Sequence, residues 1–592
     1  MPDESKYLIF DDFSGGMNTQ PARQGLNEKF GSWIENLQVL GPNFLLGVQG
    51  PAAALATLTG ETIVKIYPGL IGAQDYLIAF CASGAAYTTT VAGAVGKLAT
   101  GGTVVNFAPA GTFSATGGDL VSYNAARFLI ADTLAGYCTY DGTVFASQGG
   151  VSPNLQITAG GSGYANGATG AVTGGSGAGA AISVQTTAGV VTGVTLVNPG
   201  TGFLAGDSLT VTITAVSGGS GATANAHVWP FLLPQPSTLA IGFGRVWLAN
   251  GRTLILSGTG SATFGAGYDD FATGDASVTT TISDIDLVHS ITALRFLENY
   301  LYIIGDNSVK SIGGISVSGG TTNFTITTLS SDQGTLYQNT VLSYNRLIVF
   351  TNTVGVFAVF GASVEKISDQ MDGIFRLANF TQPPSAAVNE VNQIHTLLVL
   401  IKYIDPVIGA RSLLMAYSGK RWYVINQGTG VLFIATSILG GHADTFGTSG
   451  ADITQLLQDT IKPLAYKLQT SMTPHGDPIH DKRVIRAGIA QQVSGVSDLT
   501  MVIDTENGSA VVPLQQEFVV FNFVNNSGQA LMFTNNAGQT LSFAGSGFLL
   551  SHSGTFSVTG RYVGSTIAGT LNGIAVQGAF IEYQDAAAWG KG

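Results

Sequence analysis

Short apolar runs, joined in pairs by tight turns, recur along most of this chain. In the clearest example, Arg346–Thr351 and Gly355–Phe360 alternate β-branched and aromatic residues on either side of a Thr-Asn-Thr turn. This alternation is typical of a β-hairpin with one face against a core. The same pattern occurs in six further pairs of runs: Tyr76–Phe80 with Gly84–Thr88, Arg127–Asp132 with Gly136–Tyr140, Arg245–Asn250 with Thr253–Ser257, Tyr300–Gly305 with Ser308–Ile312, Thr396–Ile401 with Ser412–Tyr417, and Thr445–Thr448 with Ala451–Gln455.

The spacing of these hairpins predicts the fold. Most intervals between their first strands are 46 to 55 residues, and one is 118 residues. A repeat of about fifty residues that is built from hairpins is typical of a propeller blade. Each blade has two faces to bury and can bury them only against its neighbours, so the units must close into a ring. We therefore expect an all-β fold, a β-propeller of about six to eight blades. A β-sandwich, or a series of small β-domains with accidental spacing, is the alternative.

The long interval marks an insertion after Gly149. Residues 151–228 are rich in Gly, Ala, Thr and Ser, and Gly161–Tyr164 is echoed there by Gly200–Phe203. Strand-like alternation between the two copies favours a small β-module over a flexible linker, and this module should project from the ring. The expected organisation is an N-terminal arm or docking region (1–60), the first part of the propeller (61–150), the inserted Gly-rich β-repeat module (151–228), the rest of the propeller (229–460), and a C-terminal β-region that could complete the propeller (461–592).

Composition fits an all-β chain and argues against several functions. Only 10% of the residues are charged and 80 are Gly, which suits many strands and turns and disfavours a disordered chain. No run of about eighteen apolar residues occurs, and the acidic first residues lack an apolar core, so we expect neither a transmembrane helix nor a secretory signal. A net charge of −12 without a basic stripe argues against affinity for nucleic acid through its phosphates.

The sequence contains none of the common catalytic motifs: no nucleophile elbow, no phosphate-binding loop and no dinucleotide fingerprint after a strand. The segment from His475 to Asp481 is a cluster of metal-capable residues, although a polar turn is the simpler interpretation. Asp284 and Asp286 alternate along a strand, as a paired-carboxylate hydrolase would require, but solvent-facing acids explain them more simply. We therefore predict no catalytic residue, no bound cofactor and no metal site.

Three further groups of residues have simple structural interpretations. The acid pair Asp269–Asp270 is expected in a loop. Cys81 and Cys138 each lie within an apolar strand and are predicted to be small buried residues. A disulfide between them is the alternative. Three tryptophans could stack on sugars, but packing in blade cores explains aromatic residues in strands: Trp247, Trp422 and Trp589.

Several blocks of the sequence resemble one family. Phe13–Asn18 (FSGGMN), followed by Ile34–Leu37 (IENL), looks like the opening of the tail nozzle proteins of short-tailed bacteriophages, the tail tubular protein B group. The inserted module is similar to a glycine-rich repeat of several phage structural proteins. Val48–Gly50 departs from the family, which has Arg-x-Gly there, so any contact made by that Arg is in doubt. Further blocks similar to the family, in the same order, are Leu297–Gly314, Ser331–Ile374, Asp444–Asp459 and Lys467–Arg486.

The resemblance implies a structural protein of the virion tail, made in the host cytoplasm and without enzymatic activity. It implies a homohexameric ring below the head-to-tail adaptor and portal, in contact with tail fibres and the host cell surface. During ejection, dsDNA would cross the lumen without specific binding, and an acidic chain with few Lys and Arg suits such a conduit. The alternative is a propeller on the virion surface that binds a receptor or glycan through the projecting module. A propeller glycosidase or lyase is a third hypothesis, which rests only on the scattered carboxylates.

Overall fold

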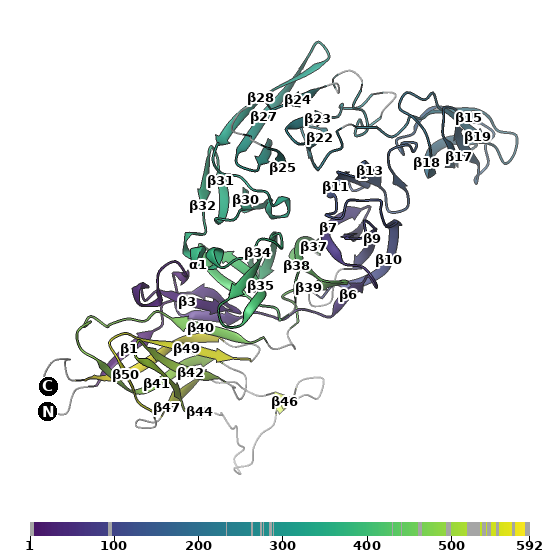
Figure 1. The fold of residues 1–592 in the computed structure, drawn as a ribbon. Coiled ribbons are helices and arrows are strands. Elements are labelled where there is room, and N and C mark those ends of the chain that lie inside the picture. The colour runs from purple at the N-terminus through teal and green to yellow at the C-terminus, as the bar shows by residue number, and fades with distance from the viewer. Residues whose placement is uncertain are drawn as a thin grey trace.

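The computed structural model shows an all-β protein with a ring of blades, a module beyond one side of the ring and a second β-domain beyond the other (Figure 1). Its helical segments include α1 (Asp372–Arg376) and the 3-10 turns η1 (Arg23–Gly25), η4 (Gln338–Thr340) and η5 (Asp369–Met371). The residues that the structure describes are 5–92, 98–232, 234–261, 265–272, 275, 278–282, 287, 289–428, 430–439, 441–459, 464–492, 499–517, 533–534, 540–541, 546–551, 556–570 and 575–586.

Within this described part, seven four-stranded antiparallel units follow one another around an axis, and we number them blades 1 to 7. From the innermost to the outermost strand, blade 1 contains β7 (Ile63–Ile71), β8 (Gln74–Cys81), β9 (Ala86–Ala92) and β10 (Thr100–Ala108), and blade 2 contains β11 (Asp119–Tyr123), β12 (Arg127–Asp132), β13 (Gly136–Tyr140) and β14 (Phe145–Ala146). Blade 3 contains β21 (Thr238–Gly242), β22 (Arg245–Asn250), β23 (Thr253–Leu256) and β24 (Thr279–Thr281), blade 4 contains β25 (Ile291–Leu297), β26 (Tyr300–Gly305), β27 (Val309–Ser318) and β28 (Thr321–Ser330), and blade 5 contains β29 (Leu342–Tyr344), β30 (Leu347–Thr351), β31 (Val356–Phe360) and β32 (Ser363–Lys366). Blade 6 contains β33 (Ser385–Val391), β34 (Ile394–Asp405), β35 (Gly409–Ser418) and β36 (Arg421–Ile425), and blade 7 contains β37 (Phe433–Leu439), β38 (His442–Ser449), β39 (Asp452–Gln455) and β6 (Ala54–Thr57).

This architecture confirms the predicted all-β propeller. Each hairpin found in the sequence is the pair of middle strands of one blade, as β12 and β13 show by matching their predicted bounds. Middle strands are packed on both faces, and the five residues of β13 are all buried. The first two strands of several blades meet in a two-residue turn with positive φ at both positions, as at Asn345 (47°) and Arg346 (63°). Such turns match the right-handed twist of the strands, so in these blades the chain reverses direction within two residues between the inner strand and the next.

The ring is closed by a strand from near the N-terminus. β6 pairs antiparallel with β39, with Ala56 opposite Ile453, and forms the outermost strand of blade 7. The inner strand of that blade, β37, packs against β7 of blade 1. The fourth strand of blade 7 thus comes from the segment in which we expected an arm, and not from residues 461–592. Short strands such as Ala54–Thr57 carry too weak a pattern to be recognised in a sequence.

Both ends of the chain form a second unit, which we call the terminal domain. Its two sheets share one hydrophobic core, to which Ile34, Leu468, Ile489, Ile567 and Ile581 contribute. One sheet contains β2 (Gly16–Met17), β3 (Phe30–Glu35), β40 (Tyr466–Thr470), β49 (Val563–Gly569), β42 (Thr500–Thr505) and β43 (Gly508–Val512). The other contains β1 (Lys6–Phe10), β4 (Leu37–Gly41), β5 (Phe44–Gly47), β50 (Ala575–Asp585), β41 (Lys482–Gln492), β48 (Val558–Gly560), β47 (Ser546–Ser551) and β44 (Leu514–Glu517). A separate pair is formed by β45 (Phe533–Thr534) and β46 (Thr540–Leu541).

The terminal domain is joined to blade 6 at a corner of the chain. Asn36 has a φ of 58°, which turns the chain from β3 of one sheet into β4 of the other. Its backbone N–H donates to Val424 O at 2.9 Å, and its side-chain oxygen accepts from the N–H of Asn426 at 2.7 Å. Beside it, buried Glu35 lies 3.0 Å from the Arg411 guanidinium of β35. The joint is therefore a continuous, hydrogen-bonded extension of blade 6.

The inserted module lies between blades 2 and 3 and has its own core. Tyr164 and Phe203, the aromatic residues of the two sequence repeats, are both buried in this core together with Val172, Ile182 and Leu196. The repeat therefore reflects two similar halves of one small β-domain. Its strands are β15 (Gln156–Ser162), β16 (Thr169–Thr173), β17 (Ala178–Thr187), β18 (Val190–Thr201), β19 (Thr210–Thr214) and β20 (Ser220–Asn225).

Candidate functional site

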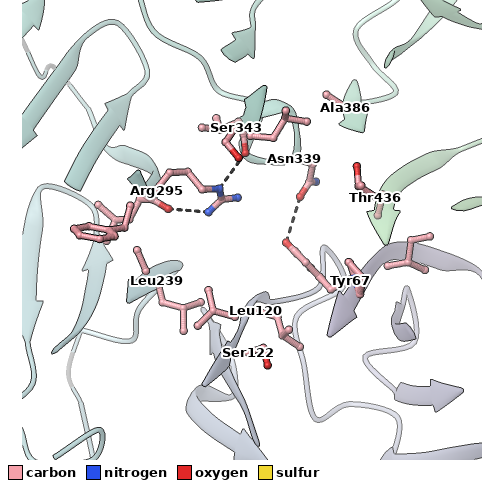
Figure 2. Close-up of a pocket in the computed structure, with 18 of the residues that line it drawn as sticks. Tyr67, Leu120, Ser122, Leu239, Arg295, Asn339, Ser343, Ala386 and Thr436 are labelled. Carbon is pink, nitrogen blue, oxygen red and sulfur yellow. Dashed lines mark hydrogen bonds between the residues drawn. The ribbon is translucent and has the colours of Figure 1, made fainter. Parts of the chain in front are cut away.

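The innermost strands of all seven blades surround a cavity of about 470 Å³ on the propeller axis (Figure 2). Its walls are largely apolar and include Ile66, Leu120, Leu239 and Ala386. Such a lining is what the apolar inner strands of a propeller produce, because their side chains alternate between the axis and the blade core. A few polar side chains interrupt this lining, and they determine what the cavity could bind.

Arg295, Tyr67 and Asn339 point towards the centre of the cavity from different blades and connections (Figure 2). The guanidinium of Arg295 donates from Nε to Val341 O at 3.0 Å and from Nη1 to Leu294 O at 2.8 Å. The Tyr67 hydroxyl lies 3.4 Å from the side-chain oxygen of Asn339. Burial raises the pKa of Tyr67 well above its ordinary value, so the hydroxyl is a neutral donor.

Asp119 is the buried acid beside this group. Its carboxylate accepts hydrogen bonds from Thr238 Oγ1 at 2.7 Å, from the backbone of Leu239 at 3.2 Å and from the Tyr67 hydroxyl at 3.2 Å. It lies 3.6 Å from Nη1 of Arg295. These contacts tie the inner strands of blades 1 to 4 together at one end of the axis.

A second set of polar contacts links the connections before three blades to blade 1, and we call it the plug. Buried Lys65 donates to Gly117 O at 3.0 Å and to the side-chain oxygen of Gln338 at 3.2 Å. Gln338 in turn donates to Ser237 O at 3.1 Å. Burial lowers the pKa of Lys65, an effect that the nearby carboxylates of Asp119 and Asp132 oppose. The plug thus links blade 1 to the connections before blades 3 and 5, across the middle of the ring.

The other end of the cavity is open. A second hollow of about 640 Å³ shares Pro68, Leu342, Ser343 and Thr436 with the first and continues to the face where the inner strands end. Tyr344 and His395 line this outer hollow. A small molecule could therefore reach the axial cavity through this outer hollow.

Asp269 lies in a turn, as expected, but its side chain is buried at the joint between the module and the ring. Its carboxylate accepts from Asn154 Nδ2 at 2.8 Å, lies 2.6 Å from Nε2 of His227 and accepts a hydrogen bond from the Ser152 hydroxyl. Next to these contacts, Trp229 stacks on Tyr137 of blade 2 with ring centroids 5.1 Å apart. Since the three partners of Asp269 belong to the two chain segments that enter and leave the module, they hold the module firmly against blade 3.

The cluster from His475 to Asp481 forms a turn. Asp477 lies 2.6 Å from Nδ1 of His480, while the ring of His475 packs against Phe10 and Tyr583. No group of three or more His, Cys, Asp or Glu side chains that could hold a metal ion occurs among the described residues. Lys482, which follows the turn, is buried and donates to the backbone of Asp477.

The other residues noted in the sequence are largely structural. Trp247 and Trp422 are buried in the propeller, and their indoles donate to Gly242 O and Ile367 O. Cys81 and Cys138 are buried free thiols, and burial raises the pKa of Cys81 to about 12. Three candidates lie outside the described residues: Asp284, Asp286 and Trp589.

One feature of the sequence marks the axial residues, although it belongs to no known motif. Lys65, Asp119 and Arg295 are single charges within otherwise apolar first strands. A charge in such a position must find partners inside the ring. Which partners it finds depends on contacts between blades that are far apart in the sequence.

No family model matches this sequence, and no curated protein matches it. Among solved structures, the crystal structure of BamB from Moraxella catarrhalis is similar, with 12% sequence identity and a TM-score of 0.30. The match covers 69% of this chain and 98% of that chain. At this level of similarity the match carries no information on activity or partners. No family or named relative supports the resemblance to phage tail nozzle proteins, which stays a hypothesis. Among the described residues, no helix has the length and hydropathy needed to cross a membrane.

Proposed function

We propose that this chain is a structural protein of a short-tailed phage tail, a nozzle subunit that acts through shape and assembly and has no catalytic activity. The proposal rests on the positions, in the structure, of the sequence blocks that resemble that family. Phe13–Asn18 packs on blade 6, since Arg421 Nε donates to Ser14 O at 3.0 Å. Ile34–Leu37 forms the corner between the sheets, and β40 and β41 supply the Lys467–Arg486 block. Blocks more than 400 residues apart thus meet in one domain, as a shared fold requires.

In this proposal the lumen for dsDNA lies between copies of the chain. The plug of Lys65, Gln338 and Ser237 ties blade 1 to the connections before blades 3 and 5, so we place the lumen outside the single propeller. A net charge of −12 gives little affinity for a passing polyanion. The terminal domain, fused to blade 6 through Glu35 and Asn36, is the part that would meet neighbouring copies and the head-to-tail adaptor and portal.

The oligomeric state of the purified full chain tests this proposal. Mass photometry, with and without the adaptor of the same phage, should give a closed multiple of the 60.9 kDa chain mass, with six copies as the expected ring. Negative-stain images of that species should show an opening on the symmetry axis. A monomer under all conditions, including saturating adaptor, would rule out the nozzle.

The firm attachment of the module favours a second candidate, binding of a receptor or glycan at the host surface. A recognition module that is held rigidly loses less conformational freedom on binding. Because Trp229 N donates to Gly150 O at 2.9 Å, the module can be removed by joining residues 150 and 229. Equal binding of the full chain and this deletion variant to host cells and to a glycan array would count against the second candidate.

A further inference from the structure

We propose that the axial cavity of the propeller binds a small organic carboxylate with an apolar body, which enters from the open face and meets Arg295. This inference does not rest on the proposed function. It rests on one charged group with an unused donor edge, on the apolar walls around it and on a route from the surface.

Arg295 is held in place with part of its guanidinium left over. Nε and Nη1 are fixed by the carbonyl oxygens of Val341 and Leu294, and the Asp119 carboxylate is also on the Nη1 side, at 3.6 Å. Within the described residues, Nη2 has no hydrogen-bond partner in the structure. The side chain is 24% exposed, and it faces the cavity (Figure 2). A fixed guanidinium with a free N–H edge is an acceptor site for a carboxylate oxygen.

The charges around Arg295 favour a monoanion over phosphate. Asp119 already offsets part of the guanidinium charge, while its own oxygens are engaged by Thr238 and the backbone of Leu239. Lys65 lies behind the cavity wall and donates to Gly117 O and Gln338, so it does not supply a second cation. A dianion would need more positive charge than this site presents.

The rest of the cavity selects the body of the ligand. The cavity wall includes the apolar side chains of Ile66, Leu120, Leu239 and Ala386. Of these, Leu239 lies beside Arg295, and Tyr67 and Asn339 lie across the cavity from it (Figure 2). Apolar pockets of several hundred Å³ with a few converging polar groups are typical of small-molecule sites. The neck shared by the two hollows, where Ser343 is exposed, is the way in.

Ligand-detected NMR on the purified full chain tests the inference, with 4-phenylbutyrate as the probe and its neutral amide as the matched control. The acid should bind about tenfold or more tightly than the amide, because a hydrogen bond to a charged partner contributes more than one between neutral groups. Absence of binding by the acid at millimolar concentration, or equal binding of acid and amide, would overturn the proposal.

Two variants locate the site. Arg295→Met should weaken binding of the acid by about tenfold or more and leave that of the amide unchanged. Ser343→Phe alters no charge but narrows the neck, so it should abolish binding of both probes. Arg346→Met is the control, since this arginine is 86% exposed on a neighbouring turn. Unchanged binding in Arg295→Met, or equal losses in Arg346→Met, would contradict the assignment. The melting temperature of each variant shows whether it is folded.

Discussion

Replacement of Asp269 should release the inserted module from the ring. The carboxylate is fully buried and serves Ser152, Asn154 and His227, which belong to both segments that connect the module. Asp269→Ala removes both carboxylate oxygens at once, so Ser152, Asn154 and His227 all lose the contact with them. We therefore expect the joint to open locally while the blades and the core of the module stay folded.

The size of the effect follows from these contacts. Removing one partner from a buried charged network costs about 3–5 kcal/mol, because the groups left behind lose their hydrogen bonds without regaining water. Asp269→Asn keeps the shape and one acceptor oxygen, so we expect a smaller loss of about 1–3 kcal/mol. Replacement of exposed Asp332 by Ala should change stability by less than about 0.5 kcal/mol and serves as the matched control.

Native-state hydrogen exchange is the appropriate assay, because a chain of several domains does not unfold in one step. Amides such as Ser152 N, which donates to His227 O at 2.9 Å, and Trp229 N should exchange faster in Asp269→Ala by the factor that corresponds to the free-energy loss. Amides of β17 and β22 should be unaffected. If the joint kept its protection in Asp269→Ala, or if protection fell throughout the propeller, the role assigned to Asp269 would be wrong.

Two further predictions concern the terminal domain. Arg23→Ala should destabilise this domain by about 2–3 kcal/mol in hydrogen exchange, because the guanidinium donates to Thr470 O, Ser565 O and Asp504, each at 2.7 Å; a loss within error would contradict it. The backbone of Ile479 and the side chain of His480 hold the pKa of Asp477 at about 2. This contribution is present above about pH 4 and is lost as the pH falls through about 2. His480→Ala should raise the Asp477 midpoint in an NMR titration, and an unchanged midpoint would refute the contact.

The blades could be predicted from the sequence because their middle strands are the most regular part of each repeat. Strands such as Leu347–Thr351 and Val356–Phe360 are packed on both faces, so selection for apolar residues leaves a clear pattern. Some outer strands are shorter or more polar, such as Phe145–Ala146 and Thr279–Thr281. Ala54–Thr57 gives no signal of its role in closing the ring.

The axial site could not be predicted because its parts lie in different blades. Tyr67, Asp119 and Arg295 are separated by more than 50 residues each, and only the closed ring brings them together. Asp269 was missed for a related reason. In the sequence it is one of two adjacent acids in a Gly-rich stretch, which is typical of an exposed loop, and its partners Asn154 and His227 lie across the insertion.

The measurement that most directly tests the proposed role is the position of this chain in the virion. An affinity tag at the exposed bend Ser217–Gly218 of the module, labelled with gold and imaged by electron microscopy, would report it. The nozzle proposal predicts several labels arranged around the tail axis, below the junction with the head. Labels on the capsid shell, or purified infectious particles without the chain, would contradict it.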